Sequence, residues 1–149
     1  MYTTYEINRD TLAIIPIDEK TTKVIEKSQE IIVERKAMDI IDDSCRYFGS
    51  SYTGRFEGTK KILGVNYKSP IIVEESRGII FFPTSSPRYP NCSWVCLNNI
   101  EDYQKSEKGT SVYFINGQTI NLNISHSSFE NQMIRSLRLA KILKRRKMI

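Results

Sequence analysis

The segment Asp42–Arg55 concentrates residue types that can hold a phosphate group. Gly49-Ser50-Ser51 joins two predicted helices within it. Backbone N–H groups and serine hydroxyls at the start of a helix can hold phosphate, and the positive end of the helix dipole assists them. Tyr52 could add a hydroxyl or a stacking surface, and the cations that could supply charge are Arg46, Arg55, Lys60 and Lys61. The pattern therefore suggests phosphate binding.

A structural interpretation of the same segment is equally concrete. Arg46 can pair with Asp42 or Asp43 one helical turn earlier, and the serines can cap the next helix. The segment also lacks the Gly-Lys-Ser/Thr ending of a P-loop. Both interpretations stay open at this point.

Three cysteines and one histidine are the other residues that could bind a metal or act in catalysis. Cys92 and Cys96 are spaced wrongly for a zinc knuckle, although Cys45 and His126 could in principle complete a Cys₃His set. No nucleophile motif accompanies His126. An odd number of cysteines argues against a disulfide scaffold and fits a reducing cytoplasm. We therefore predict no metal, no cofactor and no enzymatic activity.

Positive charge is concentrated in residues 125–149. This segment holds seven cations and one acid, a net charge of +6, whereas residues 1–124 hold 15 cations and 16 acids. The cations are Arg135, Arg138, Lys141, Lys144, Arg145, Arg146 and Lys147. A concentrated basic element on a nearly neutral body indicates a polyanionic partner, most often nucleic acid.

The basic segment is predicted to be an amphipathic helix over residues 127–147. Ser127 and Glu130 fit a capping box. The expected apolar stripe is Phe129, Met133, Leu137, Ala140 and Leu143, with Asn131, Gln132, Arg135, Arg138, Arg145 and Arg146 mainly opposite. Leu139 and Ile142 interrupt the basic face, so we expect them to pack on the domain or on a second subunit. A merely solvated helix is the alternative, and the lack of an aromatic anchor argues against a membrane-surface helix.

The remaining elements predict a single α+β domain over residues 1–149, with strands in 5–34, a helical region over 37–63 and strands in 70–123. Mostly antiparallel strands thus accompany two short central helices and a basic C-terminal helix. Within this plan we expect hairpins around residues 8–10, between Ile71–Val73 and Ile79–Phe82, and at Asn116-Gly117, where a type I′ turn is favoured. The chain has no apolar run long enough for a membrane span and no secretory signal.

The chain resembles the bacterial competence transcription factor family, ComK, because several short segments with rare residues occur in the same order as in that family. They span most of the chain and comprise 43–55 (DSCRYFGSSYTGR), 70–73 (PIIV), 82–86 (FPTSS), 90–94 (PNCSW), 116–119 (NGQT), 124–125 (IS) and 128–132 (SFENQ). The resemblance implies a DNA-binding activator of DNA-uptake genes. It further implies recognition of paired A·T-rich boxes, largely through the minor groove, by a dimer or higher assembly in the cytoplasm, at the nucleoid.

The resemblance also bears on protein partners. An activator implies contact with RNA polymerase. Family members are controlled by an adaptor that delivers them to a protease, partly through a tail beyond the last helix. Only two residues follow Lys147 here, which argues against adaptor control of this chain.

Minor-groove binding agrees with the residues present, because no helix-turn-helix pattern is evident and narrow A·T minor grooves attract inserted arginine. Arg88, held between two prolines on a predicted loop, suits such a groove. The residues expected to contact DNA are Arg46, Ser50, Ser51, Tyr52, Arg55, Lys60, Lys61, Arg88, Asn131, Arg135, Arg138, Lys141, Lys144 and Arg145. An RNA-binding module and a phosphate-handling enzyme are the alternative functions, although RNP-type aromatic runs and a set of catalytic groups are not evident.

Overall fold

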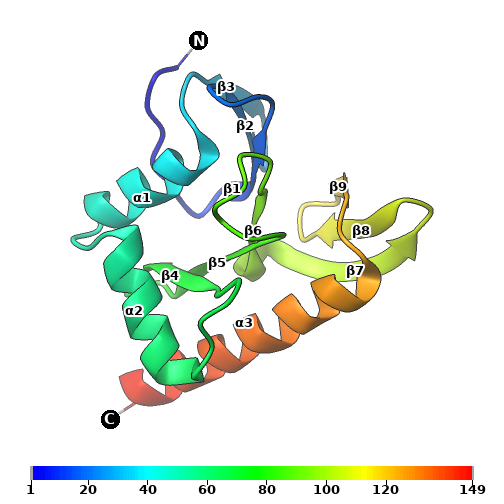
Figure 1. Ribbon diagram of the computed structural model, residues 1–149. Coiled ribbons are helices and arrows are strands. Elements are labelled where there is room, and N and C mark those ends of the chain that lie inside the picture. The colour runs from blue at the N-terminus through cyan, green and yellow to red at the C-terminus, as the bar shows by residue number, and fades with distance from the viewer. Residues whose placement is uncertain (1, 149) are drawn as a thin grey trace.

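The computed structural model describes residues 2–148 and contains two antiparallel sheets and three α-helices (Figure 1). The predicted domain over residues 1–149 also includes Met1 and Ile149, which lie outside the described residues. The larger sheet has the order β3-β2-β1-β6-β5-β4 and the smaller one the order β7-β8-β9. This architecture confirms the α+β prediction. No helix in residues 2–148 is long and apolar enough to cross a membrane.

The elements of the structure have the following bounds. The larger sheet consists of β1 (Thr11–Pro16), β2 (Thr22–Glu26), β3 (Glu30–Val33), β4 (Ile71–Glu74), β5 (Ile79–Pro83) and β6 (Trp94–Cys96). The smaller sheet consists of β7 (Ile100–Ser106), β8 (Gly109–Phe114) and β9 (Thr119–Leu122), preceded by the 3₁₀ turn η1 (Leu97–Asn99). The helices are α1 (Ala37–Tyr47), α2 (Tyr52–Leu63) and α3 (His126–Lys147).

The six-stranded sheet is buried on both faces. On one face, Ile40 and Ile41 of α1 share an apolar cluster with Phe81 and Trp94 of the sheet. On the other face, α3 and the small sheet pack against the large one, and the ring of Phe129 meets that of Phe82 at 5.4 Å, edge to face. The two-sided burial explains why β4 and β5 are continuously apolar, and it confirms the predicted hairpin between them.

The helix α3 has a different phase from the one expected. Its buried residues are Phe129, Gln132, Met133, Ser136, Leu139 and Leu143. Leu139 is fully buried and Ile142 packs against the same core, whereas Leu137 is exposed. The predicted placement of Leu139 and Ile142 on the basic face is therefore wrong, whereas the expectation that they could pack on the domain is confirmed. The buried side also includes Gln132 and Ser136, two polar residues that the apolar pattern could not identify.

The start of α3 also differs from the prediction. Ser125 is the N-cap, and its hydroxyl accepts a hydrogen bond from the Ser128 N–H at 3.2 Å. The helix therefore begins at His126 and the predicted Ser127–Glu130 capping box is not formed. Glu130 instead accepts a long hydrogen bond from the Tyr103 hydroxyl at 3.4 Å.

Two hairpin predictions need correction. Residues 5–8 form no strand: Tyr5 and Ile7 are buried in the cluster beneath α1, and β1 pairs with β2 and β6 instead. The β8–β9 hairpin at Asn116-Gly117 is present, but only Gly117 has a positive φ, of 89°. The Gly117 N–H donates to the Phe114 carbonyl, which indicates a type I turn followed by a left-handed glycine rather than type I′.

Candidate nucleic-acid interface

The outward face of α3 carries most of the exposed positive charge of the basic segment. Figure 1 shows α3 along the lower edge of the molecule, with the rest of the fold above it. Buried residues recur along one side of this helix, so Arg138, Lys141, Lys144 and Arg145 lie on exposed positions. In residues 2–148 the ion pairs join Lys27 to Asp10, Arg35 to Asp43 and Arg46 to Asp42, and none includes a cation of α3. We call Arg138, Lys141, Lys144 and Arg145 the α3 basic face.

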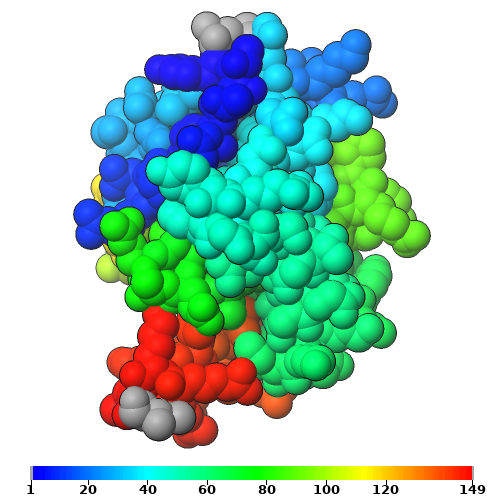
Figure 2. Space-filling model, turned by 90° about the vertical axis from the view of Figure 1, so that its left-hand side faces the viewer, coloured from blue at the N-terminus to red at the C-terminus, as the bar shows by residue number. Residues whose placement is uncertain are grey.

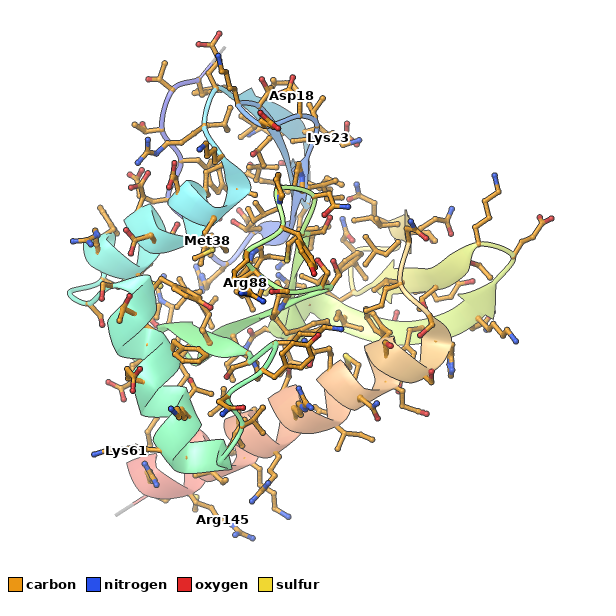
Figure 3. All side chains as sticks on the ribbon, viewed as in Figure 1. Asp18, Lys23, Met38, Lys61, Arg88 and Arg145 are labelled. Carbon is orange, nitrogen blue, oxygen red and sulfur yellow. The ribbon has the colours of Figure 1, made fainter. Side chains whose placement is uncertain are left out.

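The end of α2 extends the α3 basic face. Lys60 and Lys61 lie exposed in its last turn, and α2 packs against α3. Figure 3 shows Lys61 and Arg145 at the same lower corner, both pointing away from the body, and Figure 2 shows the C-terminal half of α3 beside α2 from another side. Cations at helix C-termini also stabilise the helix dipoles, which is a structural role for the same residues.

Arg135 and Asn131 lie on the flank of α3, beside the loop that follows α2. Arg135 is half-buried and donates to the Tyr67 carbonyl at 2.9 Å, so its guanidinium is held toward the loop. Both residues line a small cavity of about 160 Å³ together with Lys68, whose ammonium lies 5.2 Å from the Tyr67 ring centre. Lys68 was not among the predicted residues. Its positive φ of 49° is the one non-glycine case in residues 2–148 and has no sequence pattern that identifies it.

The junction of α1 and α2 is held by its own side chains. The Ser51 hydroxyl accepts from the Gly54 N–H at 3.0 Å, and the Asp42 carboxylate accepts from the Tyr52 N–H at 2.9 Å. Arg46 donates to the same carboxylate at 2.8 Å. Hydrogen bonds from Arg46 and the Tyr52 N–H, opposed by slight burial, hold the pKa of Asp42 below its usual range. Side-chain oxygens of Asp42 and Ser51 thus accept from two of the backbone N–H groups at the start of α2, as the structural interpretation expected.

Tyr52, Arg55 and Arg88 lie in a different region from the α3 basic face. Tyr52 packs edge-on to Trp94 with ring centres 6.1 Å apart, and burial raises the pKa of its hydroxyl to about 12. Tyr52 and Arg88 line a largely apolar groove of about 510 Å³ between α2 and two loops. Arg55 is half-buried and its Nε has no hydrogen-bond partner. Figure 3 shows Arg88 near the centre of the front face, apart from Lys61 and Arg145.

The predicted residues therefore divide into two regions. Lys60, Lys61 and the α3 basic face share the lower corner, with Asn131 and Arg135 on the flank of the same helix. Arg46, Ser50, Ser51, Tyr52 and Arg55 lie at the α1–α2 junction and the start of α2, and Arg88 lies across the groove from Tyr52. The first region has the electrostatic character of a polyanion-binding surface.

The cysteines and the histidine do not form a metal site within residues 2–148, where no group of three or more metal-binding side chains is placed to hold an ion. Cys45, Cys92 and Cys96 are all free and buried. Burial raises the pKa of the Cys45 thiol to about 12 and that of Cys96 to about 11. These side chains are therefore apolar packing residues.

Comparison with known proteins gives two matches that agree with each other. The family model described as "ComK protein" matches residues 2–148. The competence transcription factor of Bacillus subtilis (strain 168) is 43% identical over 136 residues, which cover 89% of this chain and 71% of that protein. No solved structure matches the chain.

Proposed function

The chain belongs to the ComK family, and on that premise we propose that it is a DNA-binding transcriptional activator of DNA-uptake genes. A Bacillus relative named as a competence transcription factor supports the regulatory part of the proposal. Such a regulator acts at the nucleoid. Duplex DNA is the partner that fits a positive helix on a nearly neutral body.

The observation that carries the proposal is the α3 basic face. Its four cations are exposed, and none forms an ion pair with a residue of the described chain. The one acid of the helix, Glu130, is bonded to Tyr103 instead. The face extends from Arg138 to Arg145, about two turns and roughly 11 Å along the helix axis. It can therefore contact a few neighbouring phosphates.

We further propose that the target is an A·T-rich box contacted largely in the minor groove. A·T tracts narrow this groove and deepen its negative potential, which favours arginine. Arg138 and Arg145 lie on the outward face, and Arg88 stands exposed on a separate loop. Arg135 is a weaker candidate for insertion, because its guanidinium is held by the Tyr67 carbonyl.

Paired boxes are most simply bound by paired subunits, so assembly on DNA is part of the proposal. Leu139 and Ile142, for which a second subunit was one of the two expected packing partners, belong to the core of the monomer. The contact between subunits therefore has to lie elsewhere on the surface.

A competition experiment tests the proposal. A fluorescent A·T-box duplex bound to the protein is displaced by unlabelled A·T-box duplex, by scrambled duplex of the same length, or by RNA. We expect the A·T-box competitor to displace the probe at the lowest concentration. Equal competition by scrambled duplex would remove sequence preference from the proposal, and stronger competition by RNA would favour an RNA-binding module.

A further inference from the structure

Two large aliphatic side chains lie exposed within the basic surface of α3. Ile134 is 60% exposed and Leu137, one turn further along, is 54% exposed. Arg138 lies four residues after Ile134, and Lys141 lies four residues after Leu137. Single exposed aliphatic residues are ordinary. A pair inside a cationic helix face, however, suits a partner that is both anionic and able to receive apolar groups.

Two partners have to be compared for this surface. A two-fold contact with a second copy through Ile134 and Leu137 would place Arg138 and Lys141 of both copies against one another, and this repulsion has no acid on the face to offset it. Duplex DNA presents phosphates to the cations and stacked base steps to the aliphatic groups. Charge complementarity therefore favours DNA.

The width of an α-helix, compared with the width of the minor groove, bears on how α3 could bind the duplex. An α-helix with its side chains is about 10–12 Å across, whereas the minor groove of B-DNA is about 6 Å wide. α3 can enter the minor groove only if the groove opens. Aliphatic side chains that insert between base steps unstack them, bend the duplex toward the major groove and open the minor groove.

We propose that Ile134 and Leu137 insert between base steps of the A·T box and bend the duplex, while Arg138 and Lys141 hold the flanking phosphates. This inference rests on the proposed function. It also supplies a source of A·T preference that needs no hydrogen bonds to bases, because TA steps unstack more easily than most other steps.

The test compares the wild-type protein with the double variant Ile134→Ala, Leu137→Ala. Ile115→Ala is the matched control, because Ile115 is 53% exposed at the β8–β9 turn and is not part of α3. The A·T-box duplex carries 2-aminopurine at its TA step, which brightens on unstacking, and a donor–acceptor pair at its ends, which reports bending.

We expect wild-type protein and the Ile115 control to brighten the probe and shorten the end-to-end distance. The double variant should lose both effects and bind the A·T box about tenfold more weakly, as expected for the loss of a buried aliphatic contact. Its salt dependence should match that of the wild type, because no charge is removed. It should also unfold at the wild-type temperature, since both side chains are exposed.

Several results would overturn the inference. If wild-type protein binds the box without bending it, or if the double variant bends it normally, the inserting role fails and the proposed function stands. If wild-type protein binds no duplex, both fail. An equal loss in the Ile115 control would make the effect non-specific. If the wild type self-associates without DNA in sedimentation and the double variant does not, the surface is a contact between copies and the inference is wrong.

Discussion

Neutralising the α3 basic face should change how strongly DNA binding depends on salt. The variant replaces Arg138, Lys141, Lys144 and Arg145 by Gln, which keeps long polar side chains on a helix and removes four positive charges. Arg135 is left intact because its bond to the Tyr67 carbonyl fixes a loop. Each phosphate contact contributes about 0.9 to the slope of log Kobs against log salt, so four lost contacts lower its magnitude by at most about 3.6.

The assay measures the affinity for A·T-box and scrambled duplexes over a range of salt concentrations. The control variant replaces four exposed cations that lie off α3, Arg9, Lys20, Lys105 and Lys108, and so removes the same total charge. We expect a large decrease in slope for the α3 variant on both duplexes and a small one for the control. Equal slopes in the wild type and the α3 variant, or equal decreases in both variants, would show that α3 is only a solvated face.

Three further predictions concern the fold and the second region. Leu139→Ala should lower the free energy of unfolding by about 2–5 kcal/mol in denaturant titration, because Leu139 is fully buried; a loss below about 0.5 kcal/mol would contradict its place in the core. Asp42→Asn should lower it by about 1 kcal/mol near neutral pH, through a weaker cap for Tyr52 and a lost partner for Arg46. The pKa of Asp42 is lower in the folded protein than in the unfolded chain, so the ionised carboxylate stabilises the fold above the unfolded pKa, and this stabilisation is lost as the pH falls through the folded pKa. The free energies of unfolding of the wild type and the variant should therefore converge in acid. A difference that does not change with pH would point to another cause. Arg88→Ala should weaken A·T-box binding about tenfold with little change on scrambled duplex or in stability, and equal losses on the two duplexes would assign Arg88 to the phosphate backbone.

Local interactions made the central helices predictable. The helical region predicted over residues 37–63 contains both α1 and α2, and α2 ends where the prediction does, because Ser51 caps its start and Gly64 ends it in the left-handed conformation, with φ of 70°. Gly49, with φ of 88°, similarly follows the end of α1. Both helix ends depend on residues within one turn of the chain, and such signals are visible in a sequence. β7 lies within the region 70–123 in which strands were predicted, but its mostly exposed, polar residues carry no apolar alternation that could identify it individually.

The basic character of the candidate interface was also evident beforehand, since the charge of residues 125–149 follows from composition alone. The face of α3 on which that charge lies was decided only by the tertiary structure. Gln132 is buried because its amide donates to the carbonyls of Lys68 and Pro83, 64 and 49 residues away in the chain. Such a bond turns a polar residue toward the core, and it thereby places Leu139 inside and Ile134 and Leu137 outside. The spacing of apolar residues carries no information about hydrogen-bond partners that are distant in the chain. It could therefore identify the helix α3 but not which of its faces is buried.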